Sequence, residues 1–396
     1  MKIAREIKYI VTVAIIVFAG CRKPYLPPVI ASGSSYLVVE GMINAGRDST
    51  IIRLSRTVAL SSTIGTTPEL NATVVVESDA NTSYPLYEKG NGYYFSPGLN
   101  LNASNKYHLK ITTSGKVYQS DFVTVKNSPP IDSVYYRTQS NGLQIYADTH
   151  DPSNTTRYYR WDFTETYIIQ SEYNSMEILV RTPVDTVLPR LPADQIFQCW
   201  VTDSSQNINL NSSAKLSSDV ITKNSIDFIP STSEKLGIRY SILVKQYALT
   251  EEAYNYWTQL KKNTEQLGSI FDTQPSEIPG NIHCVTVPSE PVLGYISVGS
   301  YSQSRIFIDS FYLPAWLPVK PYYDGCYELS FLYSDPNQAG TNTVATNIYT
   351  DLYVPITAIT PPHQEIILGF TASTRQCVDC TVRGTNKEPS FWIERR

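Results

Sequence analysis

The sequence predicts a mainly β protein, in which a small antiparallel β-sandwich precedes a larger β-rich domain with one packed amphipathic helix. Three observations predict this fold class. Tyrosine, which favours strands, occurs 29 times, against 12 Phe and 5 Trp. Short segments of alternating apolar and polar residues recur along the chain, separated by turn-forming residues. Only one segment has the three- and four-residue apolar spacing of a convincing helix.

The first 20 residues follow the three-part plan of a secretory signal peptide. Lys2, Arg5 and Lys8 form a positive start, and the apolar run 9–18 follows. This run is too short to span a bilayer. Two small residues then lead to Cys21, which lies where a cleavage site is expected. Residues 1–20 are therefore predicted to be removed on export.

Cys21 is the predicted membrane anchor. The run Phe18-Ala19-Gly20-Cys21 resembles a bacterial lipobox, although Phe18 stands where Leu is commonest. A lipobox cysteine receives a diacylglycerol on its thiol, and its new amino group is acylated, for example with palmitate. Several acyl chains on one residue make a durable anchor. The alternative is an ordinary cleaved signal peptide with an incidental cysteine. Residues 21–35, rich in Pro, Ser and Gly, are interpreted as the lipidated tether.

Residues 36–127 are predicted to form the small sandwich. A hairpin is expected where Ser114-Gly115 separates two strand patterns. Patterning alone leaves immunoglobulin-like and transthyretin-like topologies open. The clearest strand patterns are 36–43, 50–56, 72–77, 93–95, 106–112 and 116–125.

The larger β-rich domain is predicted to cover residues 128–396. Its start is set by the stiff run Ser128-Pro-Pro-Ile-Asp132, which is the best domain boundary. Strands are expected at 134–136, 142–146, 158–170, 197–201, 238–246, 292–298, 305–308, 326–333 and 365–370.

The helix of this domain is expected near 251–267. Thr250 can cap its N-terminus, and two acidic residues then complement the positive helix start. Gly268 is placed to end it. Trp257 and Leu260 belong to its apolar stripe, and we expect both to bury against the sheet.

Five cysteines follow Cys21, and they are interpreted as structural. Export permits disulfides, but five is odd, so at least one thiol should stay free or pair with another chain. Cys377-Val-Asp-Cys380 could be a redox pair, half of a metal site or part of a disulfide cluster. No second metal-ligand pair and no surrounding βαβ pattern is visible, which favours the disulfides. The candidates are Cys199, Cys284, Cys326, Cys377 and Cys380.

Composition and motifs argue against several classes of function. The formal charge is −4 and there is no basic stripe, which argues against a nucleic-acid partner. The sequence has no nucleophile elbow, phosphate loop, dinucleotide fingerprint or paired-histidine motif. We therefore predict no catalytic residue, metal or cofactor. A carboxylate pair such as Glu165 and Asp185 would serve a glycosidase only if the fold brought the two close together.

Aromatic clusters are the candidate ligand site. Tyr158, Trp161 and Tyr322 belong to clusters that could form a shelf for a glycan or a peptide. Neighbouring strand residues point to opposite faces, so part of each cluster is expected to be core instead.

Four long stretches of the sequence resemble one family. They are 36–44 with 52–57, 239–247 with 252–257, 263–271 through 274–276 to 280–284, and 377–386 with 389–392. On these residues the chain resembles a Bacteroidota lipoprotein family known only as a domain of unknown function (four-two-four-nine). The resemblance covers nearly the whole mature chain.

The resemblance implies an outer-membrane lipoprotein associated with TonB-dependent receptors. The protein would then be a binding or accessory subunit of a TonB-dependent uptake system, with the barrel as its partner. The family has no established activity, so no catalytic residues are carried over, and its matching cysteines fit a structural role. The alternatives are a structural, adhesin or envelope-assembly lipoprotein and, after these, a hydrolase. Arg22-Lys-Pro24 stands where some surface lipoproteins have an acidic export tag, so the periplasmic and cell-surface faces both stay open.

Overall fold

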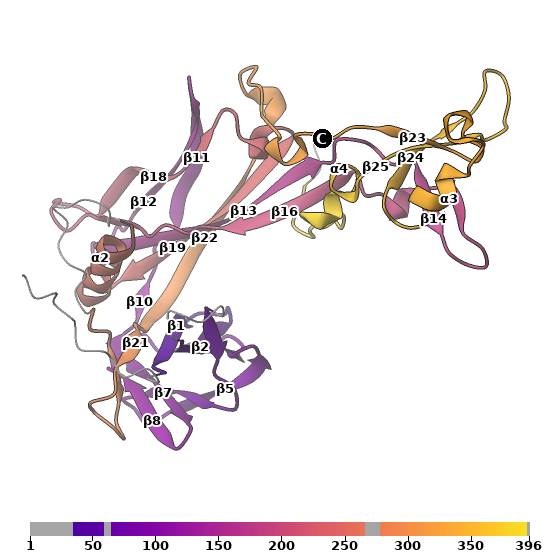
Figure 1. Cartoon of the computed structure of the whole chain (residues 1–396). Helices are drawn as coiled ribbons and strands as arrows, with labels where there is room; N and C mark the ends of the chain where they lie inside the picture. The colour runs from indigo at the N-terminus through magenta and orange to yellow at the C-terminus, as the bar shows by residue number, and fades with distance from the viewer. Residues whose placement is uncertain (1–34, 59–64, 266–277, 394–396) are drawn as a thin grey trace, which may run out of the picture.

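The computed structural model describes residues 35–58, 65–265 and 278–393. The predicted signal peptide, Cys21 and Gly268 lie outside these residues. The mainly β fold predicted from the sequence is confirmed. The strands form a sandwich at one end, a long central sheet with a second sheet above it, and an arm that projects from the far end of the central sheet (Figure 1).

The sandwich is built from two antiparallel layers that share β5. One layer pairs β1 with β2, β2 with β6 and β6 with β5. The other pairs β5 with β4, β4 with β7 and β7 with β8. Successive side chains of a strand point to opposite faces, and the residues of one face form the core. In β4, Val74 and Val76 are buried, whereas Val75 between them is only partly buried. The strands are β1 (Leu37–Asn44), β2 (Thr50–Thr57), β3 (Thr66–Pro68), β4 (Thr73–Ser78), β5 (Ser83–Gly90), β6 (Tyr93–Ser96), β7 (Lys106–Thr113), β8 (Lys116–Ser120) and β9 (Val123–Thr124).

Strands from a distant part of the chain complete the sandwich. β20 (Ile282–Cys284) pairs antiparallel with β8, and β21 (Val292–Gly294) runs parallel to β1. The first residues of β22 (Ser297–Asp309) also run parallel to β1. Ile282 and Val298 are buried in the same core as the first nine strands. The division predicted at residue 128 assigns these strands to the larger domain, whereas they pair and pack with the sandwich.

The central sheet and the upper sheet enclose the second core. In the central sheet, β13 pairs with β16, β17 and β19, and β19 pairs with β22. Trp161 is buried between the sheets, and its indole nitrogen donates to the Gln246 side chain at 3.0 Å. The central strands are β13 (Tyr158–Gln170), β16 (Gln198–Ser204), β17 (Asn209–Ser212) and β19 (Arg239–Leu249). The upper sheet contains β11 (Ile131–Gln139), β12 (Gly142–His150) and β18 (Val220–Pro230).

The arm has a smaller core than the sandwich or the two facing sheets. Its sheet has the order β23-β25-β24, and the hairpin β14–β15 packs beside it. Its elements are β14 (Glu177–Val180), β15 (Thr186–Pro189), β23 (Leu329–Leu332), β24 (Val354–Ile359), β25 (Gly369–Ser373) and the helices α3 (Thr343–Asn347) and α4 (Arg375–Val378). Short 3-10 helices span Pro192–Asp194, Glu234–Leu236, Ser310–Tyr312, Pro321–Tyr323, Pro336–Gln338 and Cys380–Val382.

The long helix expected from the sequence is present as α2 (Glu251–Glu265). Thr250 caps it as predicted, because its hydroxyl accepts a hydrogen bond from the Ala253 amide at 3.2 Å. Neither α2 nor any other helix in the described ranges is long and apolar enough to cross a membrane.

Candidate functional site

Two neighbouring strands connect the sandwich to the central sheet. β22 pairs with β1 through its first residues and with β19 from Tyr301 onward. A single strand therefore belongs both to the sandwich and to the central sheet, which we call the two lobes. β10 (Lys126–Asn127) runs parallel to β22 at this junction. A Cβ on Gly299 would lie 1.9 Å from the Lys126 carbonyl oxygen, so only glycine permits this approach of the two backbones. The junction therefore depends on close backbone contact.

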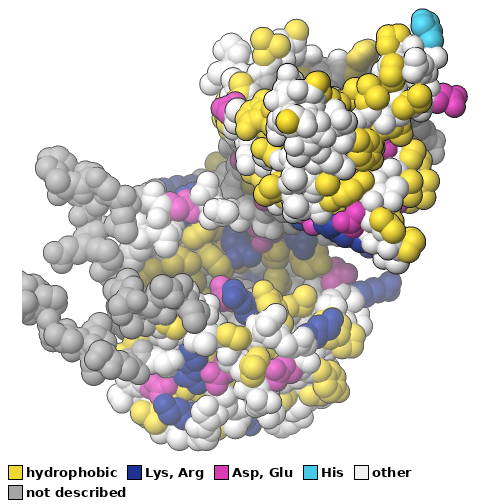
Figure 2. Space-filling model, turned by 45° about the vertical axis from the view of Figure 1, so that its right-hand side comes forward, with side chains coloured by type: hydrophobic (Ala, Val, Ile, Leu, Met, Phe, Trp, Pro, Cys, Tyr) yellow, Lys and Arg dark blue, Asp and Glu magenta, His cyan; other side chains and the backbone are white. Residues whose placement is uncertain are grey.

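A cavity of about 790 Å³ lies between the lobes, and we refer to it as the interlobe cleft. Its volume is in the range of small-molecule binding sites. The space-filling view shows the molecule hollowed between its lower lobe and the rest, with basic and hydrophobic side chains gathered in the hollow (Figure 2).

The sandwich contributes an apolar wall to the interlobe cleft. Leu37 and Val39 of β1 are buried in the sandwich core, so the alternating residue Val38 faces the opposite way, into the cleft. Ile51 and Leu293 line the same wall and remain 51% and 42% exposed. Large aliphatic side chains are thus uncovered inside a cavity.

The central sheet contributes a polar and aromatic wall. On β13, Tyr159 and Trp161 point into the second core, so Arg160 faces the cleft. On β19, Val244 and Gln246 are buried, so Lys245 and Tyr247 face the cleft by the same alternation. The register places Arg160 opposite Tyr247, Asp162 opposite Lys245, and Tyr247 opposite Tyr301 of β22.

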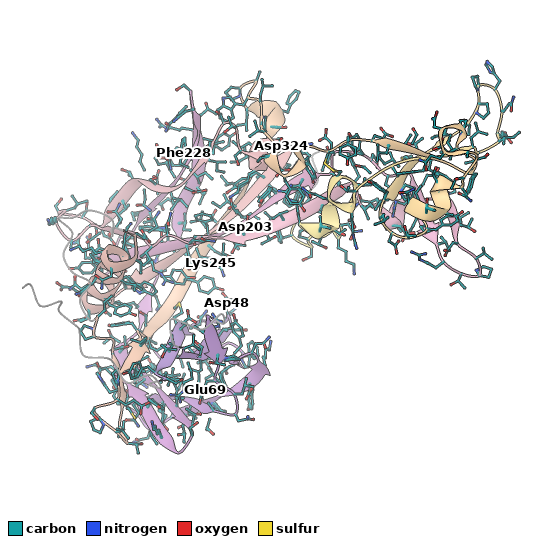
Figure 3. The ribbon with its side chains drawn as sticks, in the orientation of Figure 1. Asp48, Glu69, Asp203, Phe228, Lys245 and Asp324 are labelled. Carbon is teal, nitrogen blue, oxygen red and sulfur yellow. A yellow bond between two sulfur atoms is a disulfide. The ribbon has the colours of Figure 1, made fainter. Side chains whose placement is uncertain are left out.

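The two cations of this wall lie against aromatic rings. The Arg160 guanidinium carbon lies 4.6 Å from the Tyr247 ring centroid and 4.3 Å from that of Trp257. The Lys245 ammonium lies 5.1 Å from the Tyr301 ring centroid. Lys245 lies on the central sheet across the gap from Asp48 of the sandwich (Figure 3). The rings therefore hold both cations in place on the wall.

Acidic groups near this wall already have protein partners. Asp162 lies 3.4 Å from Arg160 and accepts a hydrogen bond from the Tyr247 hydroxyl at 3.3 Å. Burial raises the pKa of Asp162, although Arg160 and Tyr247 oppose this shift. Burial, and then a hydrogen bond to Asp48, raises the pKa of Tyr301 to about 12. Tyr301 therefore stays neutral at physiological pH.

Helix α2 closes the side of the interlobe cleft, and here the sequence-based prediction is wrong. Trp257 and Leu260 were expected to bury against the sheet, but both are half-buried and line the cleft. Only Ala253 of the helix is buried. The apolar stripe of α2 predicts that these side chains face another part of the protein, but it does not show whether they meet a sheet or line a cavity. α2 packs across the strand ends, where Tyr254 meets Tyr158 with ring centroids 5.0 Å apart, and Trp257 and Leu260 border the cavity instead.

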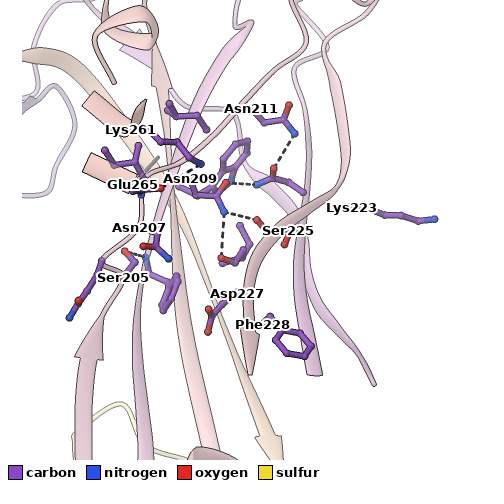
Figure 4. Close-up of a pocket in the computed structure, with 17 residues that line it drawn as sticks. Ser205, Asn207, Asn209, Asn211, Lys223, Ser225, Asp227, Phe228, Lys261 and Glu265 are labelled. Atoms are coloured by element: carbon purple, nitrogen blue, oxygen red, sulfur yellow. Dashed lines mark hydrogen bonds and ion pairs between the residues drawn. The ribbon is translucent and has the colours of Figure 1, made fainter. Parts of the chain in front are cut away.

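A second cavity, of about 710 Å³, lies between β17 and β18. Asparagine side chains line it, and the close-up shows them directed at one another and at β18, while Lys223 points away (Figure 4). Asn211 donates to Asn224 at 3.0 Å, and Asn224 donates to Asn209 at 3.3 Å. Asn209 in turn donates to the Ser225 carbonyl at 2.5 Å. These amides mainly join the two strands, so this cavity offers fewer free polar groups than its composition suggests.

The structure does not bring the predicted aromatic shelf together. Trp161 is buried and stacks on Tyr159 with ring centroids 5.5 Å apart. Tyr158 lies at the start of β13 beside α2. Tyr322 lies in a separate short helix, where the Arg383 guanidinium carbon is 4.6 Å from its ring centroid. Trp161 is therefore a core residue, and the two tyrosines occupy different surfaces.

The cysteines have structural roles. Cys199 bonds to Cys380 and Cys326 bonds to Cys377, while Cys284 is free and buried in the sandwich. The two cysteines of the Cys377-Val-Asp-Cys380 run thus each bond to a distant cysteine. Among the residues that the structure describes, no group of three or more His, Cys, Asp or Glu side chains could hold a metal ion. The predicted lipidation site, Cys21, lies outside these residues.

The carboxylates considered for a glycosidase are not paired. Glu165 is buried in the centre of β13 and bonds to Lys235 at 2.5 Å. Asp185 lies in the β14–β15 hairpin of the arm and bonds to Arg181 at 3.3 Å.

The sequence does not predict which residues line the interlobe cleft, for a physical reason. Arg160, Lys245 and Tyr301 lie on strands that were expected, and alternation shows that Arg160 and Lys245 face away from the core. The available signal was a charged side chain between buried neighbours, as in Tyr159-Arg160-Trp161. That signal also describes an ordinary solvent-facing strand, because it does not show that a second lobe covers the same face.

Three comparisons with known proteins give one informative match. Residues 22–305 match a family described as a domain of unknown function (DUF4249). No curated protein matches the chain. A solved structure titled "Biofilm associated protein - BSP domain" is 7% identical, with a TM-score of 0.15, and the match covers 70% of this chain and 59% of that chain. The chain thus spans less than two thirds of that structure, and so weak a likeness carries no argument.

Proposed function

The chain belongs to the family of unknown function DUF4249, and from this premise we propose that it is a lipid-anchored outer-membrane protein that serves as a binding or accessory subunit of a TonB-dependent uptake system. The family match names no activity. The support for the proposal therefore comes from three features of the chain itself: its N-terminus, its interlobe cleft and its arm.

The N-terminus supports export and anchoring. The lipobox-like run ending at Cys21 follows a charged and apolar leader. The two disulfides agree with this destination, because disulfides persist in oxidising compartments outside the cytosol. An acylated Cys21 would attach the chain through the tether of residues 22–35.

The interlobe cleft is the single observation that carries the binding role. It combines a volume of about 790 Å³ with uncovered aliphatic side chains on one wall and ring-supported cations on the other. A cavity with a mostly apolar lining and a few placed polar groups is the common form of a small-molecule site. The cleft therefore favours ligand binding over a purely structural role.

The arm supports the accessory role, because it exposes apolar side chains at a distance from the sandwich that carries the tether. Val184, Leu191, Leu352 and Ile366 are each more than 60% exposed. Exposed apolar patches on a folded protein often mark contact with another protein. We propose that this surface contacts the transport barrel.

Gentle detergent extraction, affinity purification and mass spectrometry test the proposal. Wild-type protein is expected in the membrane fraction with a TonB-dependent barrel in stoichiometric amount. Cys21→Ala should release a folded protein from the membrane, whereas Cys284→Ala, the matched control, should leave it attached. Leu352→Arg combined with Ile366→Arg should remove the barrel, whereas Leu70→Arg, at an exposed position on the sandwich, should not.

Other outcomes would contradict specific parts of the proposal. A Cys21→Ala protein that stays membrane-bound would overturn lipid anchoring. Recovery of the wild-type protein alone, even after crosslinking, would overturn the transport role and favour an adhesin or envelope scaffold. Loss of the barrel with Leu70→Arg but not with the arm variant would move the contact surface to the sandwich.

A further inference from the structure

The carboxylates around the interlobe cleft have bonding partners within the protein, whereas one of the cations does not. Glu40 lines the cleft and bonds to Arg53 at 3.2 Å. Asp162 is held by Arg160 and Tyr247, and Asp48 by Tyr301. Each acid therefore has a protein partner.

Lys245 has no such partner. Among the described residues it forms no direct ion pair with a carboxylate, and its ammonium lies against the Tyr301 ring. Asp162 lies opposite it in the strand register, and the charge of Lys245 opposes the raised pKa of that carboxyl group. Arg160 is a second cation on this wall: its side chain lines the cleft, and its Nη2 donates to Asp162 at 3.4 Å. Both cations face a cavity, so both can donate charge-assisted hydrogen bonds to an incoming anion.

The apolar wall of the cleft indicates that the rest of the ligand is apolar. Ile51 and Leu293 are about half exposed within the cleft, and Trp257 and Leu260 border the same space from α2. An apolar body placed there would cover these side chains and gain the free energy of removing them from water.

We propose that the interlobe cleft binds a small organic anion with a flat apolar body. Its carboxylate, or a comparable anionic group, accepts hydrogen bonds from Lys245 and Arg160, and its body packs against Ile51 and Leu293. This inference rests on the proposed binding function and adds the chemical class of the ligand. A neutral ligand of the same shape would offer Lys245 and Arg160 no negative charge, so the cleft discriminates by charge.

Two probes of nearly the same shape, one anionic and one neutral, test the inference. The full chain carrying Cys21→Ala, which avoids detergent, is titrated calorimetrically with 2-naphthoate and with the neutral 2-naphthamide. Naphthoate should bind about tenfold more tightly or better, the effect of one charge-assisted contact. Lys245→Gln should remove this difference, whereas Lys262→Gln, on the exposed side of α2, should preserve it. Ile51→Ala with Leu293→Ala should weaken both probes alike.

The remaining outcomes separate the ligand class from the proposed function. Equal affinities for the two probes, unchanged by Lys245→Gln, would overturn the anionic class while leaving a binding cleft in place. Absence of binding by either probe at millimolar concentration would overturn the inference altogether. Co-purification of the barrel depends on the arm and not on the cleft, so that experiment can succeed or fail independently of this one.

Discussion

The sandwich and the arm are both built from antiparallel strands, but they are stabilised in different ways. Among the described residues, the sandwich core contains 20 buried hydrophobic residues, whereas the arm core contains six. In the described part of the sandwich there is no disulfide, and Cys284 is an ordinary buried residue. At the base of the arm, Cys326 is bonded to Cys377. A large core needs no covalent support, whereas a small core does.

The same difference explains where the apolar surface lies. The sandwich recruits β20, β21 and the start of β22 to cover its sheets, so its apolar residues find partners within the chain. In the arm, the hairpin β14–β15 packs beside the β23–β25 sheet in the same way, but it leaves more apolar surface uncovered among the described residues. Its exposed side chains, such as Leu352 and Ile366, are available to something outside the chain.

The largest expected effect comes from removing the Cys326–Cys377 bond. The double substitution Cys326→Ala and Cys377→Ala should destabilise the arm by about 4 kcal/mol, because the bond closes a long loop in the unfolded chain. The two cysteines are 51 residues apart in the sequence. Hydrogen exchange of β23–β25 should accelerate about a thousandfold. Exchange in β4 and β7 of the sandwich should be unchanged.

Cys284→Ala is the matched control for this comparison. It removes a buried sulfur from the larger core and should cost only about 1 kcal/mol, with its effect confined to the sandwich. Faster exchange in the sandwich after loss of the arm disulfide would contradict the separation of the two regions.

The second effect compares one leucine from each region. Leu54→Ala empties a fully buried site in the sandwich and should cost about 3 kcal/mol. Leu352→Ala changes an exposed position on the arm and should stay within about 0.5 kcal/mol. Urea denaturation of the purified protein measures both. A large effect of Leu352→Ala in the isolated protein would mean that the arm surface packs against a second copy of the chain.

Local sequence patterns predict where a helix or strand lies better than they predict which other element it packs against. The helix 251–265 and its Thr250 cap follow from spacing and capping chemistry within a few residues. The return of β20 to β8 does not, because the Ile282–Ser120 pair joins residues far apart in the sequence and nothing near either residue specifies the other. β20 spans only three residues, which is too short for alternation to predict a strand.

Local sequence patterns do not predict the interlobe cleft either. Trp257 was expected in the core because a helical stripe shows that a side chain meets something, without showing whether that surface is a sheet or a cavity. Alternation places Lys245 on an outer face of the central sheet but does not show that it lies in a cleft. Only the returning strand β22 brings the sandwich opposite that face. Binding sites between lobes depend on such long-range placement.

The third effect concerns the buried ion pair of the sandwich. Glu69 accepts hydrogen bonds from Arg56 at 2.6 Å and Thr113 at 2.5 Å. Burial alone would raise the pKa of Glu69, but these two partners hold it below its usual value. Glu69→Gln should therefore cost about 2 kcal/mol at pH 7.

The pH dependence of this variant follows from the sign of the shift. A carboxyl group whose pKa is lowered by folding stabilises the protein above its unfolded pKa of about 4.3 and loses that contribution as the pH falls through its folded pKa. The stabilities of wild type and Glu69→Gln should therefore differ above about pH 4.3 and approach each other only as the pH falls below that value. Urea denaturation at a series of pH values measures this, and a constant difference across the series would contradict the assignment.

The smallest effect is expected from the corresponding ion pairs of the arm. Arg181 bonds to Asp185 at 3.3 Å and also to Asp351, but all three side chains are substantially exposed to solvent. Exposed pairs are weakened by water and by salt, so Arg181→Gln should lower the melting temperature by no more than about 1 °C at low salt and not measurably at 0.5 M NaCl. Under the same change of salt the effect of Glu69→Gln should persist, because the Arg56–Glu69 pair is largely buried. Equal salt sensitivity of the two variants would show that burial does not distinguish the sandwich from the arm in the way proposed here.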